Sequence, residues 1–266
     1  MRTCPNCGSV QNKVKYVAEP FQVVKCQTCS LVYLGNPPDE NLLYEEYYES
    51  SDYQPEVYRS NSNVAALAEL YAINAQRIAV IKRLKPAGRL LDVGCGRGYF
   101  LATAREHGFE VFGIDVSERA IEYAKRSFDV EVAAKTLDEL QESSTKFNVI
   151  TLWHVLEHFI DPFDTLKKIR TLLRENGICL VEVPNLRSLK FMLSKNQWEG
   201  GNHPLYHRTF FTSRTLERAL LNSGFSQTQR LKLSYHVAGR SAAYEASKKI
   251  LNVLALDAFL DYAAWK

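Results

Sequence analysis

The stretch from Leu90 to Gly98, LLDVGCGRG, constrains this chain most, because it combines the marks of a strand, a turn and a helix start. Its apolar residues predict a buried strand, three glycines at alternate positions follow at once, and an apolar pattern typical of a helix comes next. Glycine lets the backbone turn sharply and approach a ligand closely, and the free N–H groups of the next helix can hold a polar or anionic group. The stretch therefore predicts a ligand-binding turn, with an ordinary strand-to-helix turn as the alternative.

The glycine spacing and a downstream acid narrow the choice of ligand. Gly94, Gly96 and Gly98 follow a Gly-x-Gly-x-Gly pattern, whereas dinucleotide-binding proteins carry Gly-x-Gly-x-x-Gly, so nicotinamide cofactors are disfavoured. Asp115 ends the next predicted strand, where a carboxylate can accept both hydroxyls of a ribose lying across the turn. The alternative for Asp115 is a helix cap. Asp92, at the end of the first strand, would orient the turn and its ligand.

Beyond residue 88, apolar strand patterns alternate with helical patterns, which is typical of a parallel sheet covered on both faces. The predicted strands are 89–93, 110–115, 129–133, 146–152, 177–183 and about 226–233. The predicted helices are 97–107, 117–127, 162–174, 212–223 and about 241–254, with Ser117 and Thr212 as N-caps. The tail at 258–265 is either a last strand or the end of a continuous amphipathic helix. The fold class predicted is α/β.

Two C-x-x-C pairs near the start of the chain predict a metal site. Cys4 and Cys7 form one pair, Cys26 and Cys29 form the other, and this arrangement matches four-thiolate zinc sites. A segment of about 35 residues cannot build a useful core alone, so the zinc would supply most of its folding energy. Four cysteines leave no open coordination position, which makes the predicted zinc structural. A redox C-x-x-C is the alternative.

The chain is predicted to divide into three parts. They are a zinc-ribbon-like module at 1–36, a helical linker or lid at 37–86, and the α/β domain at 87–266 with a lid insertion at 185–211. Within the second part, helices are expected at about 40–50 and 62–85. The first of these is rich in tyrosine, and its residues could line a substrate mouth or pack the helix on its neighbour.

Composition excludes several classes of protein. The chain has 266 residues, a hydrophobic fraction of 46% and a net charge of +3. This mild charge argues against a dedicated nucleic-acid binder, whose pI tends to exceed ~9. No leader pattern opens the sequence, and no apolar run reaches the ~18 residues of a membrane helix. We therefore expect a cytoplasmic protein without a membrane span; its oligomeric state stays open.

Several motifs, taken in order, resemble those of class I S-adenosylmethionine-dependent methyltransferases. They are Leu90–Gly98, Gly113–Ser117 (GIDVS), Phe147–Ile150 (FNVI), Trp153–His158 (WHVLEH) and Val183–Asn185 (VPN). Together they are similar to the branch of ubiquinone-pathway O-methyltransferases and of sugar and natural-product methyltransferases, over about residues 62–235. The cysteine pairs resemble the zinc-binding front segment of some sugar-type members. The resemblance implies a Rossmann-like, doubly wound, mostly parallel sheet of seven strands.

This resemblance also implies a cofactor site for S-adenosylmethionine. The glycine turn would cradle the methionine part, Asp115 would hold the ribose, and His154 would lie near the sulfonium and its methyl group. At Lys135–Leu137, where many members carry an acid near the adenine, the contact would come from backbone and Leu137. The full set of expected cofactor residues is Asp92, Gly94, Cys95, Gly96, Gly98, Asp115, Val116, Leu137 and His154.

His154–His158 also matches H-x-x-E-H, in which two histidines bind zinc and the glutamate acts as a base in some peptidases. That interpretation needs the motif inside a helix, whereas here it follows directly on a predicted buried strand. We therefore disfavour a metallopeptidase. Glu157 and His158 could hold a divalent cation, but the expectation is that they orient His154.

The insertion at 185–211 carries the expected acceptor chemistry. A hydroxyl acceptor needs a base, and histidine is the side chain best matched to neutral pH. His203 or His207 would remove the acceptor proton, with Tyr206 assisting, or these residues would merely tie the loop down. The function predicted is methyl transfer to a small molecule, such as a sugar, a lipid-linked sugar or a secondary metabolite, at oxygen. The alternatives are an RNA base methyltransferase that holds RNA with its zinc module, and a non-catalytic scaffold.

Overall fold

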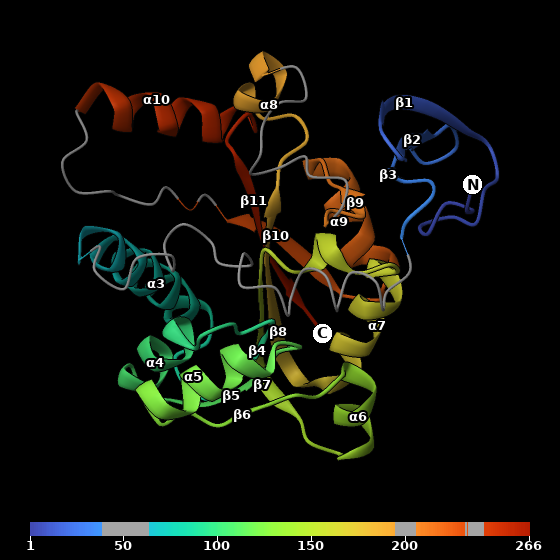
Figure 1. Cartoon of the computed structure of the whole chain (residues 1–266). Helices are drawn as coiled ribbons and strands as arrows, with labels where there is room; N and C mark the ends of the chain where they lie inside the picture. Colours follow the sequence, from blue (N-terminus) through green and yellow to red (C-terminus); the bar gives the residue numbers. More distant parts are fainter. Residues whose placement is uncertain (39–63, 195–205, 232, 234–241) are drawn as a thin grey trace.

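A seven-stranded sheet organises the molecule, in the order β10-β11-β8-β7-β4-β5-β6 (Figure 1). The computed structural model describes residues 1–38, 64–194, 206–231, 233 and 242–266. The expected helix at 40–50 and His203 lie outside the described residues. The central strands are β4 (Gly88–Val93), β5 (Phe109–Ile114), β6 (Val132–Ala133), β7 (Phe147–Trp153) and β8 (Leu173–Pro184).

The strands β4 to β8 pair in parallel, and only the C-terminal edge reverses direction. β11 (Phe259–Trp265) runs antiparallel to both of its neighbours, β8 and β10 (Gln227–Leu231). The tail is therefore a strand and not a continued helix. The expectation of a Rossmann-like, mostly parallel sheet of seven strands is confirmed. The strand expected at 129–133 is shorter, since β6 keeps only its last two residues.

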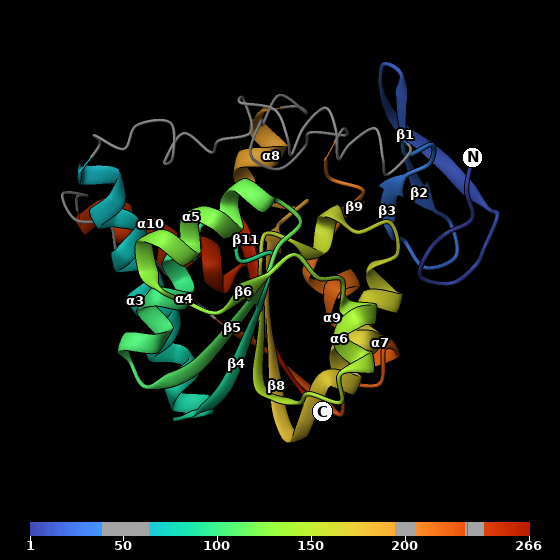
Figure 2. The same cartoon turned by 60° about the horizontal axis from the view of Figure 1, so that its bottom comes forward.

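Two layers of helices cover the sheet (Figure 2). One face carries α3 (Val64–Leu84), α4 (Tyr99–Glu106) and α5 (Glu118–Phe128), whose apolar side chains form a core with Leu90 and Val149. The other face carries α6 (Leu137–Glu142), α7 (Pro162–Leu172) and α9 (Ser213–Asn222), packed over Leu91 and Ile150. The other helices are η2 (Leu156–His158), α8 (Leu189–Ser194) and α10 (Ala242–Val253).

Side-chain caps start the helices where the sequence indicated them. The hydroxyls of Ser117 and Thr212 accept from backbone N–H groups of α5 and α9, as expected. Sequence reasoning missed α6, although Thr136 and Glu139 form a reciprocal capping box at its start. α6 is only six residues long, too short to show a helical period.

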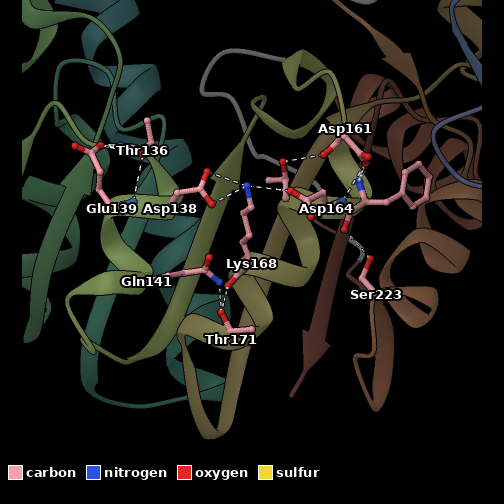
Figure 3. Close-up of polar contacts among 11 residues, drawn as sticks. Thr136, Asp138, Glu139, Gln141, Asp161, Asp164, Lys168, Thr171 and Ser223 are labelled. Atoms are coloured by element: carbon pink, nitrogen blue, oxygen red, sulfur yellow. Dashed lines mark hydrogen bonds and ion pairs between the residues drawn. The ribbon is translucent and has the colours of Figure 1, made fainter. Parts of the chain in front are cut away.

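A lysine ties the missed helix α6 to α7 (Figure 3). The Nζ of Lys168 lies 2.8 Å from Asp138 of α6 and 2.9 Å from Asp164 of its own helix. Gln141 of α6 also donates to the hydroxyl of Thr171. Exposed ion pairs such as these contribute little stability, so their role is to align the two helices. The packing between the helices comes from buried Leu140.

The N-terminal residues form a second, small sheet that includes a strand from late in the chain. Its order is β1 (Asn12–Ala18), β2 (Phe21–Cys26), β3 (Val32–Leu34) and β9 (Thr209–Phe210), all antiparallel. Figure 1 shows the blue N-terminal hairpin beside β9. Cys4, Leu31 and Tyr33 are buried in the same apolar cluster as residues of α7 and α9. The small sheet thus shares its core with the large one.

No helix within the described ranges has the length and apolar character that crossing a membrane requires.

Candidate cofactor and acceptor site

The glycine turn lies at the carboxyl end of β4, as the sequence predicted. Gly94, Gly96 and Gly98 all have positive φ, at 70°, 51° and 79°, a conformation that disfavours side chains. The backbone N–H groups of Gly94 and Cys95 donate to the carbonyl of Ile114, so the turn is fastened to the end of β5. A Cβ on Gly94 would come within 2.5 Å of Val155, and one on Gly98 within 2.8 Å of Ala124. Close packing therefore requires glycine at both places.

Two buried acids flank the turn. The carboxylate of Asp115 accepts from the N–H of Gly96 at 2.7 Å and from that of Ser117 at 2.9 Å. Burial raises its pKa, and these backbone hydrogen bonds oppose the rise. Asp92 accepts from the hydroxyl of Thr151 at 2.6 Å, and burial raises its pKa to about 7. Asp115 thus caps and anchors the turn while it faces the adjoining cavity.

A cavity of about 620 Å³ opens over the turn, at the carboxyl ends of the strands. This is where open α/β sheets bind ligands. Of the expected cofactor residues, six line it: Asp92, Gly94, Cys95, Gly96, Asp115 and His154. Three others are not part of its lining. Gly98 packs against α5, Leu137 lies in the apolar core beneath α6, and Val116 is 40% exposed beside the turn.

His154 directly follows β7 and faces Glu182 of β8 across the sheet end. Its Nε2 lies 2.7 Å from Oε1 of Glu182, and its backbone N–H donates to the carbonyl of the same residue. Its φ of 58° is unusual for a residue other than glycine, and such conformations cluster at functional sites. Burial lowers the pKa of His154, but the charge and hydrogen bond of Glu182 raise it on balance. The pair holds the imidazole in one orientation at the cavity wall.

An arginine completes this buried pair. Arg77 of α3 donates to Glu182, and its guanidinium carbon lies 4.3 Å from the centroid of the Trp153 ring. Burial raises the pKa of Glu182, but the charges of Arg77 and His154 hold it well below its usual range. Glu182 is therefore ionised. Arg77, Trp153 and His154 all line the cavity, and Glu182 fixes two of them from behind.

A second polar cluster lies beside His154 and contains one of the predicted bases. Oε1 of buried Glu157 is 3.9 Å from Nε2 of His158 and 4.0 Å from Nε2 of His207. Within the described part of the chain, neither carboxylate oxygen of Glu157 has a hydrogen-bond partner. Burial raises the pKa of Glu157 to about 7, and burial, His207 and His154 hold the pKa of His158 well below its usual range. These three groups could also supply ligands to a divalent cation.

The four cysteines of the N-terminal knuckles come together as expected. Sγ of Cys4 lies 3.5 Å from that of Cys29, and Sγ of Cys7 lies 3.6 Å from that of Cys26. All four sulfur atoms are within 4.8 Å of one another. Zn–S bonds of about 2.3 Å in a tetrahedron place sulfur atoms about 3.8 Å apart, so this cluster fits a zinc ion.

Sequence reasoning missed the partners that position these groups. Glu182 sits inside an apolar strand, where a charged residue was itself a signal, because buried charges are paired. Arg77 and Asn74 lie on α3 and line the cavity, but the helix pattern alone does not show which face meets a site. Trp153 precedes His154 directly and could have been found by that adjacency.

Comparison with known proteins agrees with this geometry. The profile of a family described as "Methyltransferase domain" matches residues 65–229, more than half of the chain. A ubiquinone biosynthesis O-methyltransferase from Coxiella burnetii is 28% identical over 148 residues, which cover 53% of this chain and 62% of that protein. The chain thus spans about three fifths of the length of this curated relative.

Solved structures show the same fold. An S-adenosylmethionine-dependent methyltransferase from Mesorhizobium loti aligns with a TM-score of 0.53 at 18% identity, over 73% of this chain and 100% of that one. The plantazolicin methyltransferase BpumL, in complex with SAH, aligns with a TM-score of 0.54 at 18% identity, over 75% and 84%. The family match and the shared sheet therefore lead to one conclusion: the chain belongs to the methyltransferase-domain family, with the class I S-adenosylmethionine-dependent fold.

Proposed function

We propose that the chain transfers the methyl group of S-adenosylmethionine to a hydroxyl oxygen of a small-molecule acceptor, with His154 as the general base. The observation that carries the proposal is the His154–Glu182 pair on the wall of the cavity that contains the glycine turn. The name of the Coxiella relative, an O-methyltransferase of ubiquinone biosynthesis, supports oxygen as the methylated atom.

The cofactor would lie across the glycine turn. S-adenosylmethionine supplies an electrophilic methyl group on a sulfonium. Gly94, Cys95 and Gly96 would hold its methionine part through their close backbone, and Asp115 would accept from the ribose hydroxyls. Methyl transfer is a displacement at carbon, so the protein mainly has to align donor and acceptor and exclude water. The carboxylate of Asp115 is already oriented by two backbone N–H groups, which lowers the cost of binding.

The acceptor would lose its proton to His154. Because Nε2 is engaged by Glu182, the neutral imidazole keeps its N–H there and presents the lone pair of Nδ1. As the acceptor oxygen takes the methyl group in place of the sulfonium sulfur, its proton would pass to Nδ1 of His154. Glu182 then stabilises the imidazolium, as the carboxylate does in a nucleophile–histidine–carboxylate triad. His154 here takes the role of base that the sequence suggested for His203 or His207, and these two residues with Tyr206 are proposed to assist on the acceptor side. The cysteine cluster is proposed to hold structural zinc.

The direct test is turnover with a panel of acceptors. Purified chain, methyl-labelled S-adenosylmethionine and a panel of phenols, sugars and nucleotide-sugars are incubated, and methylated products are identified by mass spectrometry. We expect label on an oxygen of one acceptor class. A product methylated only at nitrogen or carbon would contradict the hydroxyl acceptor, and the absence of S-adenosylmethionine binding by calorimetry would contradict the whole proposal.

A further inference from the structure

The segment that carries His207 is held from two sides. Its neighbour Arg208 donates its backbone N–H to the carbonyl of Glu157 at 2.8 Å, on the side of the site. On the other side, the carbonyl of Arg208 accepts from the N–H of Leu34 at 2.9 Å, and the next two residues form β9 against β3. His207 is thereby fixed between η2 and the cysteine-bearing sheet.

Arg2 bridges the same three parts of the molecule. Its guanidinium donates to the carbonyl of Leu34 at 2.9 Å, to that of Ile160 at 2.8 Å and to that of Arg208 at 3.4 Å. Leu34 belongs to β3, Ile160 follows η2, and Arg208 precedes β9. One partly buried side chain therefore connects the N-terminal sheet, the Glu157–His158 turn and the His207 segment.

The two parts that hold the His207 segment, Arg2 and β3, lie next to the cysteine pairs in the sequence. Arg2 lies two residues before Cys4, and β3 begins three residues after Cys29. The sulfur atoms of Cys4 and Cys29 are themselves 3.5 Å apart. A metal ion that joins these sulfurs would fix the backbone on which Arg2 and β3 depend, because a bound ligand set restricts the chain on both sides.

We propose that Arg2 is a positioning residue for the acceptor side of the site, and that zinc at the cysteine cluster controls this positioning through Arg2 and β3. The zinc-loaded module holds the His207 segment against Glu157 and His158. Without the metal, the β3–β9 pair, only two residues long, loses its support and His207 leaves its place. The cofactor side, which makes no use of β3 or β9, is unaffected. This inference rests on the proposed methyl transfer only where kcat is measured; the hydrogen-exchange measurement is independent of it.

Amide hydrogen exchange tests it without requiring activity. Zinc-loaded and chelated protein are compared by mass spectrometry, following the amides of Leu34 and Arg208. We expect exchange at both to rise about tenfold or more after chelation, since a lost backbone hydrogen bond exposes the N–H. Exchange over 118–128, which is α5, is the internal control and should not change.

A substitution tests the proposal even if circular dichroism shows that chelation unfolds the whole chain. Arg2→Gln is examined in the zinc-loaded state, with Arg174→Gln as the matched control. Arg174 also donates to a backbone carbonyl, that of Lys146, but outside the acceptor cluster. We expect faster exchange at Arg208 and a lower kcat in Arg2→Gln alone, with unchanged S-adenosylmethionine affinity in both variants. Unchanged exchange at Arg208 in Arg2→Gln would overturn the proposal, whatever the activity.

Discussion

The two halves of the cavity are built in different ways. The cofactor half uses backbone and the carboxylate of Asp115 from two neighbouring strand-to-helix turns, at 92–98 and 115–117. The half proposed for the acceptor uses side chains from α3, β7 and η2, backed by Glu182 of β8, and the Glu157–His207 cluster adjoins it. These residues are far apart in sequence. The backbone turn can bind S-adenosylmethionine in any member of the family, whereas the side chains of the other half can differ between members that act on different acceptors. We therefore expect the acceptor specificity of the chain to reside in the half that is built from side chains.

The largest expected effect is that of His154→Asn, which should lower turnover and leave cofactor binding unchanged. Asparagine tolerates the positive φ at this position, so the variant removes the imidazole and keeps the backbone. Turnover should fall by about 10²–10⁴-fold, because a general base contributes on that scale. Calorimetry should find S-adenosylmethionine affinity within about twofold of wild type.

His107→Asn is the control for that experiment, since His107 is the C-cap of α4 and its ring Nδ1 lies 2.8 Å from the carbonyl oxygen of Thr103 in the same helix. A His154→Asn enzyme with near-normal turnover would remove His154 from the mechanism.

The second prediction concerns the buried acid of the cofactor half. Burial raises the pKa of Asp92 to about 7 from an ordinary value of 3.8. Between these values the folded state binds a proton that the unfolded state has lost, so Asp92 favours folding at low pH and its contribution is lost as pH rises toward 7. Against Asp92→Asn, wild type should lose up to about 1.4 kcal/mol of unfolding free energy per pH unit.

Urea unfolding of the two ligand-free proteins at pH 5, 6 and 7 measures this difference. Glu157, whose pKa is also raised to about 7, titrates in both proteins and cancels. A pH-independent difference between wild type and Asp92→Asn would show that Asp92 ionises normally in the fold.

The third prediction weakens the cofactor half without touching the acceptor half. Asp115→Asn replaces one acceptor oxygen by an N–H₂ group, which opposes the N–H of either Gly96 or Ser117. S-adenosylmethionine affinity should fall by about 10–100-fold, since hydrogen bonds to a charged group are worth about 1.5–3 kcal/mol. Asp129→Asn, at the exposed C-cap of α5, should leave the affinity unchanged. A large fall in kcat of Asp115→Asn at saturating cofactor would contradict this prediction, because it would mean that Asp115 takes part in methyl transfer itself.

The smallest expected effect is a difference in stability between substitutions of two glycines in the same turn. Gly94→Ala and Gly96→Ala both place a side chain at positive φ, but only the first brings Cβ within 2.5 Å of Val155. Gly94→Ala should therefore be less stable than Gly96→Ala by about 1–2 kcal/mol, from overpacking. Thermal unfolding of the ligand-free variants measures the difference, and equal melting temperatures would mean that Val155 moves aside freely.

Local chemistry was enough for the cofactor half and for most of the fold. Strand and helix periods, the caps at Ser117 and Thr212 and the glycine turn depend on residues within a few positions of each other, so the sequence displays them directly. α6 and β9 escaped because each is too short to repeat a period. Leu137, which the resemblance placed near the adenine, is buried in the apolar core beneath α6, and this position depends on the packing of α6 and not on its neighbours in sequence.

The acceptor half could not be derived in the same way. Tertiary contacts bring Arg77 and His154 to Glu182, bring His207 to Glu157, and place Arg2 across three segments of the chain. Such contacts join residues separated by up to 206 positions, and no local pattern records them. The donor turn was therefore readable from nine consecutive residues, Leu90 to Gly98, and from Asp115 at the end of the next strand, because local backbone and this one carboxylate form it. The acceptor cluster needed the folded molecule, because its chemistry exists only where distant side chains meet.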